Sequence, residues 1–109
     1  MLVSLFGNKT IEKVLFFIQR YENGYAREIS ETFSISVNGI QQQLKRLENG
    51  NILVSRLYGR VRLYQFNPRY PFLRELRALL ESAMAHLSRE EIKRYYMKRT
   101  RPRKPGKPI

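Results

Sequence analysis

A change in the spacing of apolar residues near the middle of the chain restricts the folds that this sequence can adopt. Up to residue 48 the apolar positions recur every three or four residues, which is the pattern of helices with one buried face. Over residues 52–66 the pattern changes to a period of two, which is typical of strands. Gly59 and Arg60 stand at the centre of this stretch and predict the turn of a β-hairpin. The sequence thus predicts helices followed by a hairpin.

Three helices are expected before the hairpin. The first covers Lys9 to Tyr21, with Asn8 as its N-cap, and the second covers about Ala26 to Phe33. After a break of three residues, Ser36 caps a third helix over about residues 36–48. Two helices joined by so short a turn form a helix-turn-helix.

Two further helices are expected after the hairpin. Pro68 and Pro71 end the second strand, because proline cannot donate to a sheet. A long helix then runs to about Leu87. Ser88, with Glu91 three residues later, forms the capping box of a last helix.

These elements predict a single domain of the α+β class. It is mainly α with a small β-hairpin, a winged helix-turn-helix with additional C-terminal helices over residues 1–98. A chain of 109 residues with 42% hydrophobic residues is enough for one such core. Residues 99–109 are basic and rich in proline, and we expect them to form a disordered tail.

The chain is strongly basic. It has 21 lysines and arginines, nine acidic residues and a formal net charge of +12. Six of the basic residues fall in the last twelve positions without an acid between them, and the remainder of the chain is basic as well. These six are Lys98, Arg99, Arg101, Arg103, Lys104 and Lys107. Such an excess attracts an anionic partner, with nucleic acid as the first candidate and an anionic membrane as the second.

The third helix has an outward face of amides and one cation. This face carries Asn38, Gln41, Gln42 and Lys45. Such side chains can read base edges in the major groove of double-stranded DNA. Ser36 and Arg46 lie at its borders, where phosphate contacts are expected. The alternative is the ordinary polar face of a surface helix, and the position after the short turn favours DNA.

The hairpin has a basic tip. Arg56, Arg60 and Arg62 are expected to hold the DNA backbone or the minor groove. Charges on a hairpin also protect edge strands from aggregation, but that role does not require charges of one sign. In the strands, one face is expected to hold Leu53, Ser55, Leu57, Val61, Leu63 and Gln65.

These features resemble the ArsR-like winged helix-turn-helix superfamily. There the third helix leads into the hairpin through Val-x-x-x-Leu-x-x-Leu-Glu-x-x-Gly-Leu-Val, followed by a Gly-Arg wing and Tyr-x-x-Asn. The matching positions are Ile40, Leu44, Leu47, Glu48, Ile52, Leu53, Gly59, Arg60, Tyr64 and Asn67. Asn51 replaces the usual glycine, and asparagine tolerates the same left-handed conformation. The resemblance implies a DNA-binding transcriptional regulator of bacterial or archaeal type.

The sequence also resembles a prokaryotic subgroup of that superfamily, both before the first helix and after the wing of the DNA-binding module. The shared features are Leu5, Phe6 and Gly7 before the first helix, and Pro68, Pro71 and Leu76 after the wing. In this subgroup the module often precedes, or is encoded near, a nucleotidyltransferase domain. No such domain follows in this sequence, so the resemblance does not carry that activity over. It covers roughly residues 5–80.

The sequence offers no residue set for an enzyme or a metal site. There is no cysteine, and His86 is the only histidine, so a metal site of the Cys/His type is not expected. Glu90 and Glu91 are explained as favourable charges at a helix start. We find no converging nucleophile and base, and no glycine-rich phosphate loop. Neither enzymatic activity nor a cofactor is expected.

A cytoplasmic location is the expectation. The longest apolar run, residues 14–18, is too short to cross a bilayer. The first six residues are apolar but lack the basic region and cleavage site of a signal peptide.

The long helix after Pro71 is expected to form a homodimer. Its apolar stripe consists of Leu73, Leu76, Leu80, Ala83 and Leu87. Packing on the first helix of the same chain is the alternative. The resulting hypothesis is a dimeric, sequence-specific DNA-binding regulator. The competing hypothesis is a winged-helix module for protein interaction, or an RNA-binding module that acts through its basic tail.

Overall fold

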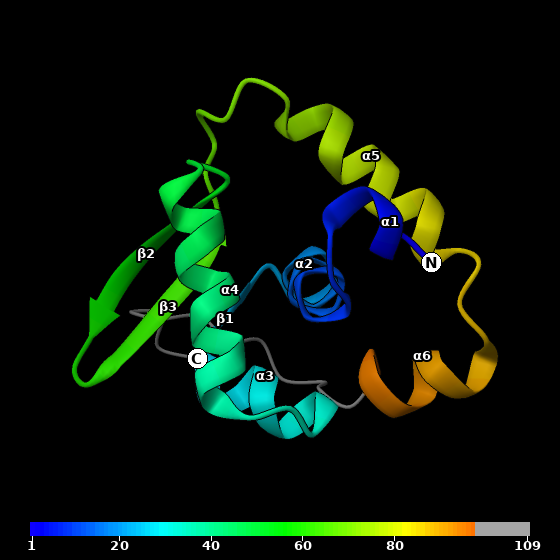
Figure 1. The fold of residues 1–109 in the computed structure, drawn as a ribbon, viewed down its shortest axis with the longest axis horizontal. Coiled ribbons are helices and arrows are strands. Elements are labelled where there is room, and N and C mark those ends of the chain that lie inside the picture. Colours follow the sequence, from blue (N-terminus) through cyan, green and yellow to red (C-terminus); the bar gives the residue numbers. More distant parts are fainter. Residues whose placement is uncertain (98–109) are drawn as a thin grey trace.

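The computed structural model describes residues 1–97, so the predicted tail at 99–109 lies outside the described residues. Its elements are α1 (Val3–Phe6), α2 (Lys9–Tyr21), β1 (Asn23–Gly24), α3 (Ala26–Phe33), α4 (Val37–Asn49), β2 (Leu53–Tyr58), β3 (Val61–Phe66), α5 (Leu73–Met84) and α6 (Arg89–Tyr95). Helix α2 is seen end-on at the centre of Figure 1, with the other helices and the hairpin arranged around it. The predicted α+β architecture is confirmed.

The hairpin has the predicted two-residue turn. Tyr58 pairs with Val61, and Gly59 has the left-handed φ of 61° that such a turn requires. β1 adds a short third strand on the other side of β3, giving an antiparallel sheet in the order β1-β3-β2.

The predicted distribution of hairpin residues between the two faces is wrong. Because the turn contains two residues, Leu57 lies opposite Arg62 and Ser55 opposite Tyr64. Residues that pair directly across antiparallel strands point to the same side of the sheet. Ser55 and Arg62 therefore share a face, whereas the sequence pattern separated them.

The helix boundaries follow the predicted caps. The Asn8 side chain accepts a hydrogen bond from the Ile11 backbone N–H at 2.7 Å. The Ser36 hydroxyl accepts one from the Gly39 N–H at 3.0 Å. Ser88 and Glu91 form the predicted capping box of α6. Three residues separate α3 from α4, as expected of a helix-turn-helix.

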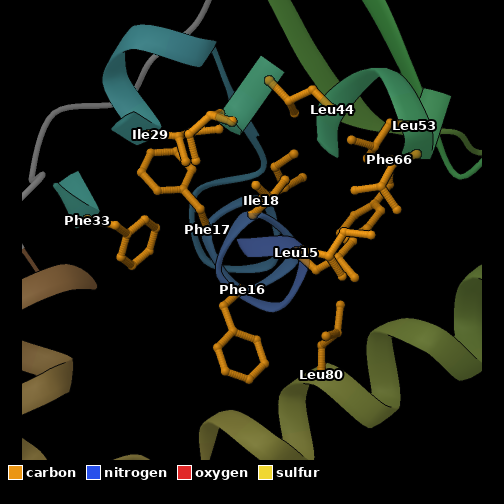
Figure 2. Close-up of a cluster of buried hydrophobic side chains, with 14 of the residues drawn as sticks. Leu15, Phe16, Phe17, Ile18, Ile29, Phe33, Leu44, Leu53, Phe66 and Leu80 are labelled. Atoms are coloured by element: carbon orange, nitrogen blue, oxygen red, sulfur yellow. The ribbon is translucent and has the colours of Figure 1, made fainter. Parts of the chain in front are cut away.

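The core is built around α2. Five consecutive side chains of this helix, Val14 to Ile18, are at most 3% exposed. A helix that is apolar on all sides needs neighbours on all sides. Figure 2 shows Phe17 beside Ile29 of α3, Leu15 beside Phe66 of the sheet, and Phe16 pointing away from them.

Helix α5 packs on α2 of the same chain, which corrects part of the predicted dimer interface. Leu80 is fully buried in the core, and Ala83 is 6% exposed. On the polar side, Arg77 Nε donates to Gln19 Oε1 at 3.0 Å, and the Arg77 guanidinium pairs with Glu22 at 3.1 Å. Leu80 and Ala83 thus contact their own chain and are not available to a second copy.

The remaining differences from the sequence prediction are small. α1 was not predicted, and it is a single turn that ends at Gly7 with a φ of 99°. α5 ends at Met84, three residues before the expected end at Leu87.

Candidate nucleic-acid interface

All four predicted base-reading residues lie on the exposed side of α4. Its inward side is formed by Ile40 and Leu44, both fully buried, and by Leu47 at 4%. The helical repeat therefore turns the polar residues outward. These exposed residues are Asn38, Gln41, Gln42 and Lys45.

An open depression of about 430 Å³ runs along this polar side of α4. It is lined by Gln41, Gln42, Lys45, Arg46 and Asn49. The lining offers amide donors and acceptors together with two cations, and no carboxylate. Asn49 is an addition to the predicted set, because the predicted helix ended at about residue 48, whereas α4 includes Asn49.

The helix start presents a second group of polar atoms. Ser36 is exposed, and its hydroxyl oxygen already accepts the Gly39 N–H. A Cβ at position 39 would lie 3.1 Å from that oxygen, so glycine keeps the cap uncrowded. The start of a helix carries the positive end of the helix dipole, which favours an anion such as a phosphate.

The hairpin exposes all three of its predicted arginines. Arg56 Nη1 donates to the Tyr58 hydroxyl at 3.3 Å, which holds its side chain along the strand. Among residues 1–97, Arg60 at the turn makes no hydrogen bond or ion pair. Leu57 lies between these arginines with 57% of its surface exposed. The tip therefore combines exposed cations with an apolar side chain.

A polar bridge joins the hairpin to α4, and sequence reasoning missed it. Arg62 Nη1 donates to the Ser55 hydroxyl oxygen at 2.9 Å, and the same hydroxyl donates to Glu48 Oε2 at 2.6 Å. Burial raises the pKa of the nearby Tyr64 hydroxyl; Glu48 adds to this effect and Arg62 opposes it. The bridge depends on strand register, so periodicity alone could not reveal it.

The charge on this side of the molecule has one dominant sign. Residues 37–66 contain five basic side chains and one acid, Glu48. Glu48 is held by Ser55. The outer sides of α4 and the hairpin therefore form a positively charged surface, which suits a polyanion.

No group of three His, Cys, Asp or Glu side chains in residues 1–97 is placed to hold a metal ion. His86 Nδ1 lies 3.0 Å from the Ser82 carbonyl oxygen of the preceding helical turn. None of the described helices has the length and apolar content required to cross a bilayer.

Comparison with known proteins rests on structure, since no protein-family model and no curated protein matches the sequence. A mutant of Lactococcus lactis ZitR in its apo form aligns with a TM-score of 0.54 and 17% identity, over 78% of this chain and 73% of ZitR. YusO from Bacillus subtilis aligns with a TM-score of 0.56 and 17% identity, over 79% and 67% of the two chains.

A third similar structure is AdcR, the adhesin competence repressor of Streptococcus pyogenes. It aligns with a TM-score of 0.54 and 8% identity, over 78% of this chain and 66% of AdcR. At such low identities the likeness shows the fold, which is a winged helix-turn-helix with α3 and α4 as the paired helices and β2 and β3 as the wing.

Proposed function

We propose that this protein is a sequence-specific, double-stranded DNA-binding transcriptional regulator that acts as a homodimer. Helix α4 lies in the major groove, and the β2–β3 hairpin lies on the backbone or in the minor groove. The observation that carries the proposal is the exposed side of α4, which bears amides and cations and points away from the core. α4 is the second helix of the helix-turn-helix, which is the helix that enters the major groove.

The side chains of α4 divide into base contacts and phosphate contacts. Asn38, Gln41 and Gln42 can each form two hydrogen bonds with adenine, and Lys45 can reach the acceptors of guanine. A good bidentate pair discriminates between bases by about 1–3 kcal/mol. Arg46 contributes to the phosphate contacts that fix the orientation of the helix.

The wing supplies affinity without reading sequence. Arg60 is exposed at the turn, and Arg56 and Arg62, also exposed, extend the positive surface along both strands. Contacts of this kind hold phosphates or enter a narrow minor groove.

The proposal also includes a regulatory role, a place in the ArsR-like superfamily and a location in the cell. One similar structure is named a repressor, which supports a regulatory role. The Gly59-Arg60 wing and its Asn67 exit favour the ArsR-like superfamily. DNA reading by amides and arginines requires no cofactor, no metal and no catalytic group, and we assign none. The cytoplasm, where prokaryotic DNA lies, is the proposed location, and no nucleotidyltransferase activity is assigned.

The proposed dimer uses the outer side of α5. Phe72 is 62% exposed and Leu79 is 37% exposed, although both are large and apolar. Leu73, Leu76 and Leu87 are half-buried against the core and border this side. Two copies joined there would read half-sites about one helical turn apart. A strictly monomeric species in analytical ultracentrifugation at tens of micromolar would contradict the dimer.

The experiment that tests the function is selection of bound duplexes from a randomised DNA library. We expect a partly palindromic consensus. Gln41→Ala and Gln42→Ala should relax preference at individual positions, because they remove base contacts. Arg60→Ala should weaken binding to every duplex by a similar factor, because it removes a phosphate contact. Equal enrichment of all sequences would refute sequence-specific binding.

A second candidate function rests on the cluster of basic residues after Met97. Six cations without an acid could bind RNA or an acidic protein independently of the domain. The salt dependence of duplex binding separates the two candidates. If removal of residues 99–109 abolished all duplex binding, the tail-borne function would be favoured.

A further inference from the structure

Leu57, in β2 beside the turn of the wing, is a large apolar side chain with more than half of its surface exposed. It follows Arg56 and lies opposite Arg62, and Arg60 stands in the turn. All three arginines are exposed, and residues 53–66 contain no acid. A single exposed leucine is ordinary on a protein surface. Leu57 differs because positive charge surrounds it.

The strand register places Leu57 on the side of the hairpin that faces α4. Side chains alternate along a strand, and directly paired residues share a side. Leu53 and Phe66 form such a pair, and both belong to the core. Ser55, two residues after Leu53, donates to Glu48 of α4. Leu57 is the next residue of β2 on this side, so it extends the surface that meets the proposed recognition helix.

The residue opposite Leu57 is directed away from the tip. Arg62 Nη1 donates to the Ser55 hydroxyl oxygen at 2.9 Å, and Ser55 belongs to the next pair on the same side, further from the turn. The Arg62 guanidinium is therefore held toward α4, whereas Leu57 stays exposed. In Figure 1 the turn of the hairpin projects beyond α4 and the other helices.

This combination of groups fits the minor groove of a duplex better than it fits the phosphate backbone. Leucine has no hydrogen-bond donor to offer a phosphate, so its exposed apolar surface gains nothing there. Proteins that enter the minor groove use arginines, which its negative potential attracts, and insert apolar side chains between base steps. The wing carries both kinds of group beside one turn. The charge and the exposed leucine thus favour the same binding partner.

We propose that Leu57 enters the minor groove as an apolar wedge, partly unstacks one base step and bends the duplex beside the site read by α4. This inference rests on the proposed function, because it requires α4 in the major groove. The arginines of the wing supply affinity. Leu57 adds a preference for steps that deform easily, TA and CA/TG, over stiff A-tracts, and it does so without a hydrogen bond to any base.

The test compares Leu57→Ala with Val61→Ala in the full-length chain. Val61 is the matched control, because it is apolar, is 37% exposed beside the same turn and pairs with Tyr58 on the opposite side of the hairpin. Leu57→Met is the conservative variant, since methionine keeps an apolar side chain of similar volume. Circular dichroism and thermal melting check that each variant is folded.

The DNA is a duplex selected by the unmodified protein, with the steps that flank the α4 site changed either to TA or to an A-tract. Energy transfer between dyes at the two duplex ends measures bending, and permanganate oxidation locates thymines that have lost their stacking. The unmodified protein, Leu57→Met and Val61→Ala should all bend the TA duplex, expose the same thymines and bind it several-fold more tightly than the A-tract duplex.

Leu57→Ala should bind the TA duplex about tenfold more weakly than the unmodified protein does, because most of the buried apolar surface is lost. It should also leave the thymines stacked and bind the two duplexes about equally. The base preference of α4 should remain, since its side chains are unchanged.

The contrary results separate the wedge from the proposed function. Selective binding by the unmodified protein without bending or exposed thymines would refute the wedge and leave the proposed function intact. Thymines that stay exposed in Leu57→Ala would refute the assignment to Leu57. Equal losses in Leu57→Ala and Val61→Ala would refute its assignment to the side that faces α4. If the unmodified protein bound all duplexes equally, the proposed function would fail and the wedge with it.

Discussion

The Ser55 hydroxyl in β2 donates a 2.6 Å hydrogen bond to the Glu48 carboxylate near the end of α4. The same hydroxyl oxygen accepts from Arg62 in β3, so one serine joins the proposed recognition helix to both strands of the wing. The contact is partly buried, where a charged hydrogen bond contributes more than it does in water. The angle between helix and wing is therefore determined in part by Ser55.

Ser55→Ala should reduce discrimination between a selected duplex and an unrelated one by several-fold. The change removes the bridge and leaves the Glu48 carboxylate without its partner, at a cost of about 1–3 kcal/mol in the free energy of unfolding. Fluorescence anisotropy on the two duplexes measures the ratio of affinities. Glu48→Gln is the companion variant, because it keeps an acceptor but removes the negative charge; it should raise affinity for both duplexes. Unchanged ratios in Ser55→Ala would mean that the bridge does not orient the wing.

Gly24→Ala should destabilise the fold. A Cβ at this buried position in β1 would lie 2.7 Å from Phe17 Cε1 and 3.2 Å from Ile29 Cδ1, both in the core. Overpacking of this kind costs about 1–3 kcal/mol. Urea denaturation measures the loss. Gly50→Ala is the control, because the nearest atom would be 3.6 Å away and the backbone φ is −86°. Equal stability of the two variants would show that the core around Phe17 relaxes without cost.

Leu79→Ala and Leu80→Ala should act on different properties, although the two residues are neighbours. Leu80 is fully buried against α2, so its truncation should cost about 2–5 kcal/mol of folding stability. Leu79 is 37% exposed on the proposed dimer surface, so its truncation should leave the fold of the single chain intact and weaken self-association. Denaturation and sedimentation equilibrium measure the two effects. A Leu79→Ala variant that dimerises as tightly as the unmodified protein would remove Leu79 from the interface.

Local chemistry made the helices and the wing predictable. Asn8, Ser36 and Ser88 each cap their own helix within three residues, so their role can be read from adjacent sequence. The outward position of Gln41 and Gln42 follows from the helical repeat alone. These features depend on residues that are close together in the sequence, and the structure places them as expected.

Relationships between distant segments were not predictable in the same way. An apolar stripe such as that of α5 looks the same whether it faces its own chain or a second copy, and only the fold shows that Leu80 faces α2. The Glu48–Ser55 contact needs a strand register that a one-residue error in the hairpin would change. The Phe33 and Tyr95 rings lie 5.0 Å apart between centroids, although more than half of the chain separates them in sequence. Tertiary packing decides each of these cases.

Tyr96 should make the protein sensitive to alkaline pH. Burial raises its pKa above the ordinary value of 10.0, and Glu91 and Glu12 add to the shift. The unfolded chain therefore releases this proton at a lower pH than the folded chain does. The contribution of Tyr96 to folding stability is fully present below about pH 10 and is lost as the pH rises above that value toward the folded pKa.

The Tyr96→Phe variant keeps the ring against Phe33 but cannot ionise. Between about pH 10 and 12 its free energy of unfolding should therefore fall less steeply than that of the unmodified protein. Urea denaturation at several pH values compares the two. Parallel pH profiles for the Tyr96→Phe variant and the unmodified protein would mean that Tyr96 leaves the core before it ionises.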